Sequence, residues 1–399
     1  MLRLANDTAP IGAQIDTFLP ADNGPAQIVL AIARAVPALA GRLAEGRIYG
    51  DPTAIVGIND SGDPQKALDM GAHDHMVAAL RAAGVRQVLS EEAEAVIPLN
   101  SGGLWDVAID PIDGSGSLGI GAPLGLLFSV MPTAAEGFLR SGRAVVAAGY
   151  ASFGHSCDFG FSLGAGVHIA TLDQPQGRFR LTHQNLRLPE KAKTVAFNAS
   201  NERHWPPGLQ AWAGDLRAGK DGPRARDFNM RWLAAAVGEL HRILLQGGCF
   251  LYPADRRTGY QNGRLRTLYE AVPIAFLIEQ AGGLATDGLT PILDRQPRAL
   301  HENTPLIFGA RDEVTTIGAP PAETCRPDAP LPRSWSLNSL TKWRAAANHF
   351  GPAAVSVALR LCQTERTKLR LQLLSSARYR TRNLSSYTDE LRERGALPI

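Results

Sequence analysis

The chain has 399 residues and a formal net charge of +3, and this length is enough for two domains and a substantial hydrophobic core. Apolar residues make up 45% and charged residues 20%, values close to the averages of globular proteins, which excludes a wholly disordered chain. There is no evident window of about eighteen apolar residues and no signal-like apolar core at the start, so the sequence predicts neither a membrane span nor secretion.

The charge is distributed unevenly along the chain. Residues 319–399 contain thirteen Lys and Arg against six Asp and Glu, a net charge of +7, and the preceding body has a net charge of −4. The four cysteines are widely spaced without a C-x-x-C pair, which is typical of a reducing cytoplasm and speaks against structural zinc. We therefore expect a cytoplasmic globular protein with a basic tail.

The first predicted helix covers residues 25–45 and ends near Gly46. Pro37 lies inside it, and we expect this residue to kink the helix or to split it in two. The spacing indicates an amphipathic helix that packs on a larger core. Its apolar positions are Ile28, Ile32, Val36, Leu39 and Leu43.

Two short segments then present carboxylates at the ends of predicted elements. The run N-D-S-G-D-P-Q-K-A-L-D (residues 59–69) is a polar loop leading into a helix. Helix capping by Asp63 and a solvated helix face for Asp69 explain these acids as well as catalysis does. The run V-R-Q-V-L-S-E-E ends a strand with Glu91 and Glu92, whose side chains point to opposite faces and so cannot share one role. A solvated strand end is an equally good interpretation of this pair.

The stretch W-D-V-A-I-D-P-I-D-G-S-G-S (residues 105–117) concentrates the residues that can do chemistry. Its apolar centre predicts a buried strand, which delivers Asp110 and Asp113 at its C-terminal edge. The small residues that follow leave backbone N–H groups free to surround an anion, as in a phosphate-binding nest. Oxygen ligands three residues apart beside such a nest fit Mg²⁺ bridging to a phosphate, whereas the simpler interpretation is a turn between strands.

The middle of the chain predicts more strands and then a second domain. Residues 125–132 form a strand, and residues 146–169 form further short strands with glycine turns. The polar residues 185–193 are typical of a boundary between domains. We expect an N-terminal α/β domain at 1–185, a C-terminal α/β domain at 186–318, and a proline-rich linker with a basic tail at 319–399.

The second half contains further polar residues at the ends of predicted elements. The run V-A-F-N-A-S-N-E-R-H-W places Asn198 at a strand end, where a turn residue is the commoner interpretation. Arg231 lies near the predicted start of a helix, whose buried face begins at Leu233 and which ends at Gly247. The guanidinium of Arg231 could bind a phosphate through two parallel hydrogen bonds. We interpret His241 on the same helix as structural, because no partner nucleophile is visible.

The run C-F-L-Y-P-A-D-R-R begins the last informative segment. A strand at residues 250–252 ends with Tyr252 and is followed by a basic loop that includes Arg264. Glu270 then comes just ahead of a helix, which Gly282 and Gly283 stop.

These motifs together resemble the class 1 fructose-1,6-bisphosphatases, which belong to the Mg²⁺-dependent sugar and inositol phosphatase superfamily. D-P-I-D-G-S-G-S is similar to the family signature D-P-L-D-G-S-S. Four further segments match the family in its own order, so the resemblance covers roughly residues 25–313. It implies a layered αβαβα sandwich that hydrolyses fructose 1,6-bisphosphate to fructose 6-phosphate and phosphate. It also implies a cytoplasmic homotetramer serving gluconeogenesis or the Calvin cycle.

The resemblance also implies a role for each matching residue. Two or more Mg²⁺ ions would be held by Glu91, Asp110, the Ile112 carbonyl, Asp113 and Glu270. The attacking water would be activated by Asp69 and Glu92, while Asp63 would assist a further metal as a catalytic residue. The reacting phosphate would lie in the nest formed by Asp113, Gly114, Ser115 and Gly116. The distal phosphate would be held by Asn198, Arg231, Tyr252 and Arg264, with Arg231 reaching into a neighbouring subunit.

Some positions depart from the family pattern. Arg264 replaces a lysine, and an ammonium and a planar guanidinium are not interchangeable, so substrate affinity is expected to differ. Leu104 and Pro132 replace a Lys and an Arg associated with the inhibitor AMP, so we expect weak AMP inhibition. Beyond Val314 the resemblance stops. The basic tail lacks the pattern of an RNA-binding module, and a merely solvated extension is favoured over nucleic-acid binding.

Three other functions stay open at this point. A sedoheptulose-1,7-bisphosphatase or a dual-specificity enzyme would use the same chemistry. A non-catalytic sugar-phosphate sensor is disfavoured, because an inactive relative would be free to lose the acidic ligands. The third alternative makes the basic tail the functional part, on an inherited scaffold.

Overall fold

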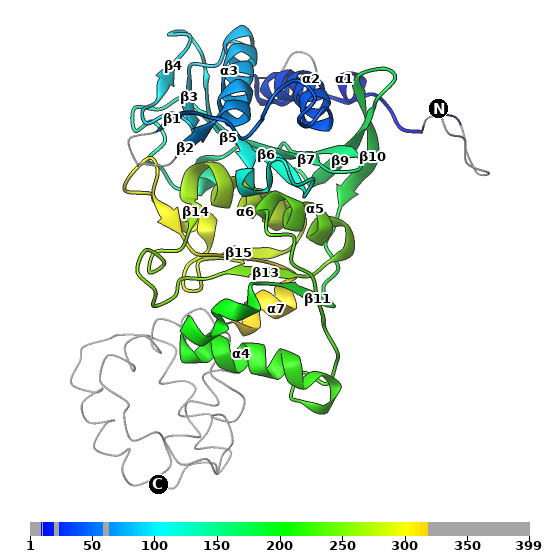
Figure 1. Ribbon diagram of the computed structural model, residues 1–399, viewed down its shortest axis with the longest axis vertical. Coiled ribbons are helices and arrows are strands. Elements are labelled where there is room, and N and C mark those ends of the chain that lie inside the picture. Colours follow the sequence, from blue (N-terminus) through cyan, green and yellow to red (C-terminus); the bar gives the residue numbers. More distant parts are fainter. Residues whose placement is uncertain (1–8, 10, 20–23, 59–63, 318–399) are drawn as a thin grey trace, which may run out of the picture. The chain divides into compact units, whose positions relative to one another are not determined.

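The computed structural model describes residues 9, 11–19, 24–58 and 64–317. All of them belong to one compact unit, Met1–Pro321. Asp63 and the expected tail at 319–399 lie outside the described residues. Within this unit the elements stack in five layers, in the order helix, sheet, helix, sheet, helix (Figure 1). The expected αβαβα sandwich is therefore confirmed.

The larger sheet has eight strands in the order β10-β9-β8-β7-β6-β5-β3-β4. β3 and β5 run parallel, whereas the other neighbours in this sheet are antiparallel. The carboxyl ends of β3 and β5 therefore meet at one edge, where two of the acidic segments follow. The strands are β3 (Gln87–Ser90), β4 (Ile97–Pro98), β5 (Trp105–Asp113), β6 (Leu124–Pro132), β7 (Ala147–Phe153), β8 (Cys157–Ser162), β9 (Val167–Asp173) and β10 (Arg178–Leu186). A separate hairpin pairs β1 (Ile55–Ile58) with β2 (Pro64–Lys66).

The outer face of this sheet is covered by α1 (Ile15–Phe18), α2 (Gly24–Ala44) and α3 (Ala67–Ala82) (Figure 1). α2 runs without a break through Pro37, so the expected split does not occur. Proline removes the hydrogen bond that its N–H would make one turn back, but burial of the flanking apolar face keeps the helix intact.

α2 also corrects the expectation that no window is apolar enough to span a membrane. By length and composition this helix passes that test, with a mean hydropathy of 1.4. Half of the window is buried inside the protein, and Ile28, Ile32 and Val36 are almost fully enclosed. Core helices of globular proteins pass the same test, and the packing of α2 against the sheet accounts for its composition.

The smaller sheet has five strands in the order β12-β11-β13-β17-β15. α5 (Ala236–Gln246) and α6 (Val272–Gln280) lie between the two sheets, and α4 (Pro207–Ala218) and α7 (Arg311–Thr316) cover the far face (Figure 1). The strands are β11 (Thr194–Ala196), β12 (Asn229–Met230), β13 (Cys249–Tyr252), β15 (Leu284–Thr286) and β17 (Leu306–Gly309). A short ladder pairs β14 (Leu265–Arg266) with β16 (Asn303–Thr304).

The hydrophobic core extends across the expected domain boundary. One buried cluster joins Tyr150 of the first sheet to Leu240 of α5, Leu277 of α6 and Phe308 of the second sheet. The chain crosses between the two halves in the segment that separates β10 from β11. The two halves thus share one hydrophobic core. The division into 1–185 and 186–318 stays a prediction.

Candidate functional site

The two central aspartates lie at the buried end of β5. β5 pairs with β6 through Asp110↔Leu127 and Asp113↔Gly125, so three steps on β5 match two on β6. This is a β-bulge, which inserts one extra residue into a strand. In a regular strand, residues three apart point to opposite faces. The bulge therefore turns Asp110 and Asp113 to the same side, and both are almost completely buried.

The start of α5 holds Asp113 in place. The backbone N–H of Val237 donates to Asp113 Oδ2 at 2.7 Å. This approach needs two glycines: a Cβ on Gly125 of β6 would lie 2.4 Å from Val237, and one on Gly114, just after β5, would lie 2.7 Å from Ala235. The helix dipole favours a negative charge at this position.

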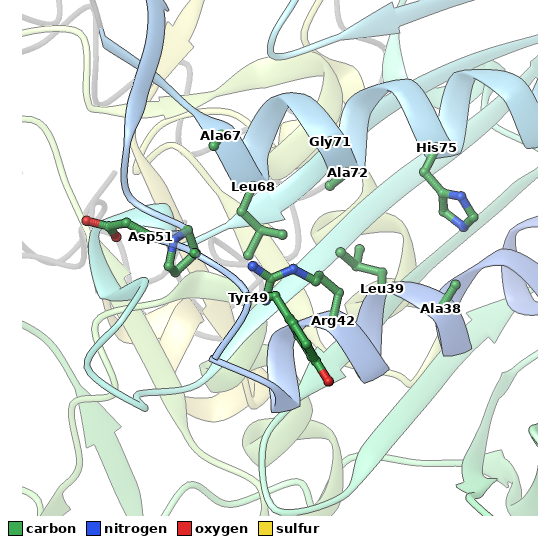
Figure 2. A pocket seen from close by; sticks show the side chains of 12 residues that line it. Ala38, Leu39, Arg42, Tyr49, Asp51, Ala67, Leu68, Gly71, Ala72 and His75 are labelled. Carbon is green, nitrogen blue, oxygen red and sulfur yellow. The ribbon is translucent and has the colours of Figure 1, made fainter. Parts of the chain in front are cut away.

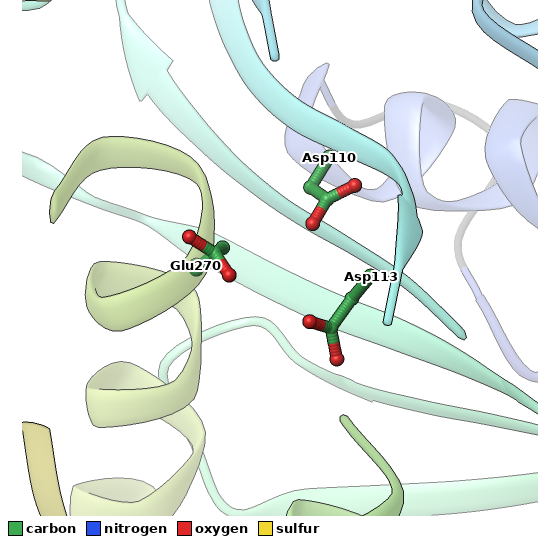
Figure 3. Close-up of side chains that lie close together, drawn as sticks. All are labelled: Asp110, Asp113 and Glu270. Atoms are coloured by element: carbon green, nitrogen blue, oxygen red, sulfur yellow. The ribbon is translucent and has the colours of Figure 1, made fainter. Parts of the chain in front are cut away.

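Glu270 brings the second half of the chain to the same point. It lies in a π-helical turn, Thr267–Ala271, which continues directly into α6. One carboxylate oxygen each from Asp110, Asp113 and Glu270 lie within 4.8 Å of one another (Figure 3). Three buried carboxylates this close repel one another unless they share protons or bind a cation.

The two glutamates after β3 complete the acidic site. Glu91 follows the last residue of β3, and its backbone N–H donates to the Ile109 carbonyl at 3.1 Å. Its carboxyl group lies within reach of the Asp110 carboxyl, and a hydrogen bond between them needs a proton on one of the two. The Glu92 carbonyl accepts a hydrogen bond from Gln65 at 2.9 Å, which ties this glutamate to β2. Glu91 therefore lies beside Asp110, while Glu92 lies on the side of the hairpin, and the role of Glu91 as a metal ligand stays a prediction.

Burial and mutual repulsion raise the proton affinity of the whole cluster. Burial, with the charges of Glu91 and Asp113 next, holds the pKa of Asp110 and of Glu270 well above the usual range. Burial raises the pKa of Glu91 to about 7. It raises the pKa of Asp113 to about 6, against the lowering effect of the Val237 N–H. A divalent cation would remove this unfavourable charge, and an oxygen-only donor set is the type that Mg²⁺ prefers.

Asp69 and Glu92 form a second acidic pair beside the cluster. Asp69 lies in the first turn of α3 and is buried, and its Oδ1 has no hydrogen-bond partner. Burial, followed by the charge of Glu92, raises the pKa of Asp69 to about 7. Burial also raises the pKa of Glu92. A carboxylate with this pKa and an unused oxygen is suited to exchange a proton near neutral pH.

The predicted phosphate nest is a tight turn after β5. Gly114 has a left-handed φ of +81°, and a 3₁₀ turn follows at Ser115–Ser117. The first amides of such a turn have no acceptor within it, and they are available to an anion. The Lys66 ammonium donates to the Ser115 carbonyl at 2.6 Å. Lys66 is a cation at the nest that sequence reasoning missed, although it was part of the quoted 59–69 motif.

The expected distal phosphate contacts come together only in part. Asn198 and Tyr252 line one small pocket, to which Arg257 and Tyr260 also contribute. The Arg264 guanidinium lies 5.2 Å from the centre of the Tyr260 ring, and that of Arg257 lies 3.8 Å from it. Sequence reasoning noted a basic loop here but did not assign Arg257 or Tyr260.

Arg231 lies outside the pocket that Asn198 and Tyr252 line. It is exposed and follows β12, five residues before α5 begins at Ala236. Leu233, taken as the first buried helix residue, also precedes the helix. Ala234 has a left-handed φ of +69°, which keeps the backbone out of the helical conformation at this point. The expected reach of Arg231 into another subunit stays a prediction.

A separate cavity of about 390 Å³ lies between α2 and α3. Figure 2 shows Leu39 and Arg42 of α2 facing it together with Leu68 and His75 of α3. The residues of the acidic cluster do not line it. It is therefore distinct from the catalytic candidates.

The comparisons with known proteins identify the family of this chain. The family model described as "Fructose-1-6-bisphosphatase, N-terminal domain" matches residues 31–184, and that described as "Fructose-1-6-bisphosphatase, C-terminal domain" matches residues 188–320. Two proteins named "Fructose-1,6-bisphosphatase class 1", from Brucella suis and Brucella abortus, are 50% identical over 312 residues. The match covers 77% of this chain and 92% of each relative.

A solved structure is also similar. The fructose-1,6-bisphosphatase of Leishmania major, described as a holo form, superposes with a TM-score of 0.72 at 29% sequence identity. The match covers 78% of this chain and 99% of that chain.

Proposed function

The chain belongs to the class 1 fructose-1,6-bisphosphatase family, and from this membership we propose how its residues release phosphate from fructose 1,6-bisphosphate. The family's activity is hydrolysis of a phosphate monoester, and the family is metal-dependent. The observation that carries the proposal is the buried group Asp110, Asp113 and Glu270, whose oxygens converge from both halves of the chain.

The metal ligands are Glu91, Asp110, Asp113, Glu270 and the Ile112 carbonyl. The buried carboxylates with raised pKa values support this assignment, since they form an oxygen-rich pocket with an excess of negative charge. We expect two or more Mg²⁺ ions per subunit. When bound, Mg²⁺ neutralises phosphoryl oxygens and stabilises the departing alkoxide.

Asp69 and Glu92 accept the proton of the attacking water. The unused Oδ1 of Asp69 and its pKa of about 7 support this role. The water oxygen forms a bond to phosphorus while the bond from phosphorus to the C1 oxygen of the sugar breaks, and the departing oxygen takes up a proton. Asp63 is expected to assist, but it lies outside the described residues.

The remaining residues position the two phosphates. The turn from Asp113 to Gly116 and the Lys66 ammonium would hold the reacting phosphate. The distal phosphate would be held by Asn198, Tyr252 and Arg264, with Arg231 supplied by a neighbouring subunit. Binding the distal phosphate orients the substrate in a way that a monophosphate cannot. A cytoplasmic homotetramer acting in gluconeogenesis or the Calvin cycle follows from the family relationship and stays a proposal.

The test is phosphate release from purified protein with fructose 1,6-bisphosphate, sedoheptulose 1,7-bisphosphate and an inositol monophosphate. We expect fructose 1,6-bisphosphate to give the highest kcat/KM. A preference for the seven-carbon substrate would change the substrate but keep the mechanism. Absence of turnover on every substrate, with sugar phosphate still bound, would indicate a sensor instead.

A further inference from the structure

Residues 301–303, in the C-terminal half, lie directly against the turn that carries Glu270. The Glu302 carbonyl accepts hydrogen bonds from the Thr267 N–H at 2.8 Å and from the Thr267 hydroxyl at 2.9 Å. β14 and β16 pair through Arg266↔Asn303, and the Arg266 guanidinium donates to the His301 carbonyl at 2.9 Å. The Arg266 N–H in turn donates to the Glu270 carboxylate. This segment therefore determines where the Glu270 turn lies.

The His301 side chain extends this contact to the other half of the chain. Its Nδ1 lies 2.9 Å from the Tyr269 hydroxyl, and its Nε2 lies 3.1 Å from the Glu94 carbonyl, 207 residues away in sequence. A carbonyl oxygen can only accept, so Nε2 carries the proton. In the neutral ring Nδ1 is then an acceptor, and Tyr269 donates to it. One imidazole thus bridges two segments in a single defined tautomer.

Both bridged segments carry proposed metal ligands. Tyr269 immediately precedes Glu270, and Glu94 lies three residues after Glu91. Tyr269 is completely buried, in a small apolar cluster with Leu89 of β3 and Ala108 of β5. The Tyr269 end of the bridge is therefore part of the core, whereas its Glu94 end lies at the surface.

We propose that His301 is a positioning residue, which holds the segment after β3 and the Glu270 turn at the separation that lets Glu91 and Glu270 bind one metal. Glu91 and Glu270 carry like charges when both are ionised, and the two carboxylates then repel each other. Without a restraint the two segments would move apart before a cation arrives. The inference rests on the proposed metal site, but it concerns residues that touch neither metal nor substrate.

Three substitutions separate the parts of the bridge. Tyr269→Phe removes only the hydroxyl. His301→Asn keeps an oxygen that can accept from Tyr269, whereas His301→Gln keeps an N–H that can reach the Glu94 carbonyl. We expect each to weaken Mn²⁺ binding about tenfold, measured by electron paramagnetic resonance on the full chain without substrate, because supporting hydrogen bonds typically contribute this much to metal affinity. KM for fructose 1,6-bisphosphate at saturating Mg²⁺ should stay within about twofold of wild type.

The matched control is Tyr150→Phe. The Tyr150 hydroxyl lies 2.8 Å from His241 Nδ1, so this variant loses the same kind of bond in the same protein. His241 Nε2 faces Asp158 at 3.6 Å and so does not reach the segments that carry Glu91 and Glu270. We expect a lower melting temperature and Mn²⁺ binding within about twofold of wild type.

The outcomes are distinguishable. Weaker Mn²⁺ binding in the three bridge variants but not in Tyr150→Phe supports the positioning role. Equal metal binding in all variants, or equal loss in the bridge and control variants, would overturn it, since His301 would then contribute only to stability. Wild-type protein that binds no Mn²⁺ at all would instead refute the proposed metal site itself.

Discussion

The two ends of the proposed active site are built in different ways. At the metal end, carboxylates are buried, and the ends of β3 and β5, the start of α5 and the turn before α6 fix them. At the distal end, Arg264 is exposed and Tyr260 comes from a loop between β13 and β14. Rigid elements fix side chains more precisely than loops do. We therefore expect the metal end to set the catalytic rate and the distal end to set substrate affinity.

Asp113→Ala should have the largest effect. It removes a carboxylate that the Val237 N–H holds in the centre of the cluster. We expect kcat to fall more than about 10³-fold, corresponding to about 4 kcal/mol of barrier, at any Mg²⁺ concentration. EDTA should abolish wild-type activity, and added Mg²⁺ should restore it. Circular dichroism should show that the variant is folded, and full turnover in metal-free buffer would disprove the mechanism.

Arg264→Ala tests the distal end and should act on KM. The loss of a guanidinium near Tyr260 is expected to raise KM about tenfold, in the range of a lost charge-assisted hydrogen bond, while kcat changes less than threefold. Arg264→Lys restores the family residue and should recover most of the affinity. Steady-state kinetics on all three proteins decide the matter. A fall in kcat with unchanged KM would remove the distinction between the two ends.

The buried cluster should also make stability depend on pH. The pKa of Glu91 is about 7 and that of Asp113 about 6, both above the values of exposed carboxyls, so the folded protein binds more protons than the unfolded chain. In metal-free buffer the free energy of unfolding should therefore fall as the pH rises from about 5 to 8. Mg²⁺ binds the ionised carboxylates, so its stabilising effect should grow over the same range. Melting temperatures with and without Mg²⁺ test this, and a metal-free protein that gains stability as the pH rises would contradict it.

AMP inhibition should be weak. Leu104 and Pro132 lie together at one end of the β5–β6 ladder, where the Thr133 N–H donates to the Leu104 carbonyl. Neither side chain offers a positive charge to a nucleotide phosphate. We expect less than half inhibition at about 1 mM AMP, which corresponds to a binding free energy weaker than about 4 kcal/mol. Strong inhibition at micromolar AMP would show that other residues supply the phosphate contacts.

The smallest effect is expected from removing the C-terminal extension. The compact unit that contains both ends of the site finishes at Pro321. Truncation after this residue should leave kcat within about twofold, less than about half a kcal/mol of barrier. Comparing turnover and melting temperature with the full chain provides the measurement. A folded but inactive truncated protein would mean that the extension completes the active site.

The acidic residues could be singled out from the sequence because they lie in short motifs with specific spacing, and their roles stay predictions. Asp110, Asp113, Glu91 and Glu270 do come together, although the bulge that turns the two aspartates to the same face has no signal in the residues themselves. A short sequence motif predicts the local backbone conformation, whereas the pairing register of a strand depends on the neighbouring strand.

The errors arose where backbone conformation depends on tertiary contacts. The alanine-rich run after Arg231 favours a helix by propensity, yet Ala234 adopts a left-handed conformation and the helix starts later. Of the two outcomes expected at Pro37, a kink or a split, the split does not occur, because the buried face stabilises the helix. His301 could not be assigned a role, because its partner carbonyl belongs to Glu94. Contacts over such separations leave no periodic trace in a single sequence.

The position of Glu270 has a consequence for how the protein is made. The ribosome synthesises three of the proposed ligands, Glu91, Asp110 and Asp113, more than 150 residues before Glu270. It synthesises β16, the strand that pairs with β14 just ahead of Glu270, later still. Domains generally begin to fold from the N-terminal side during synthesis. A nascent chain that has completed only the first sheet therefore displays an incomplete ligand set. Full metal binding becomes possible only when the body of the chain has been synthesised, so metal occupancy would report completed folding in the cell.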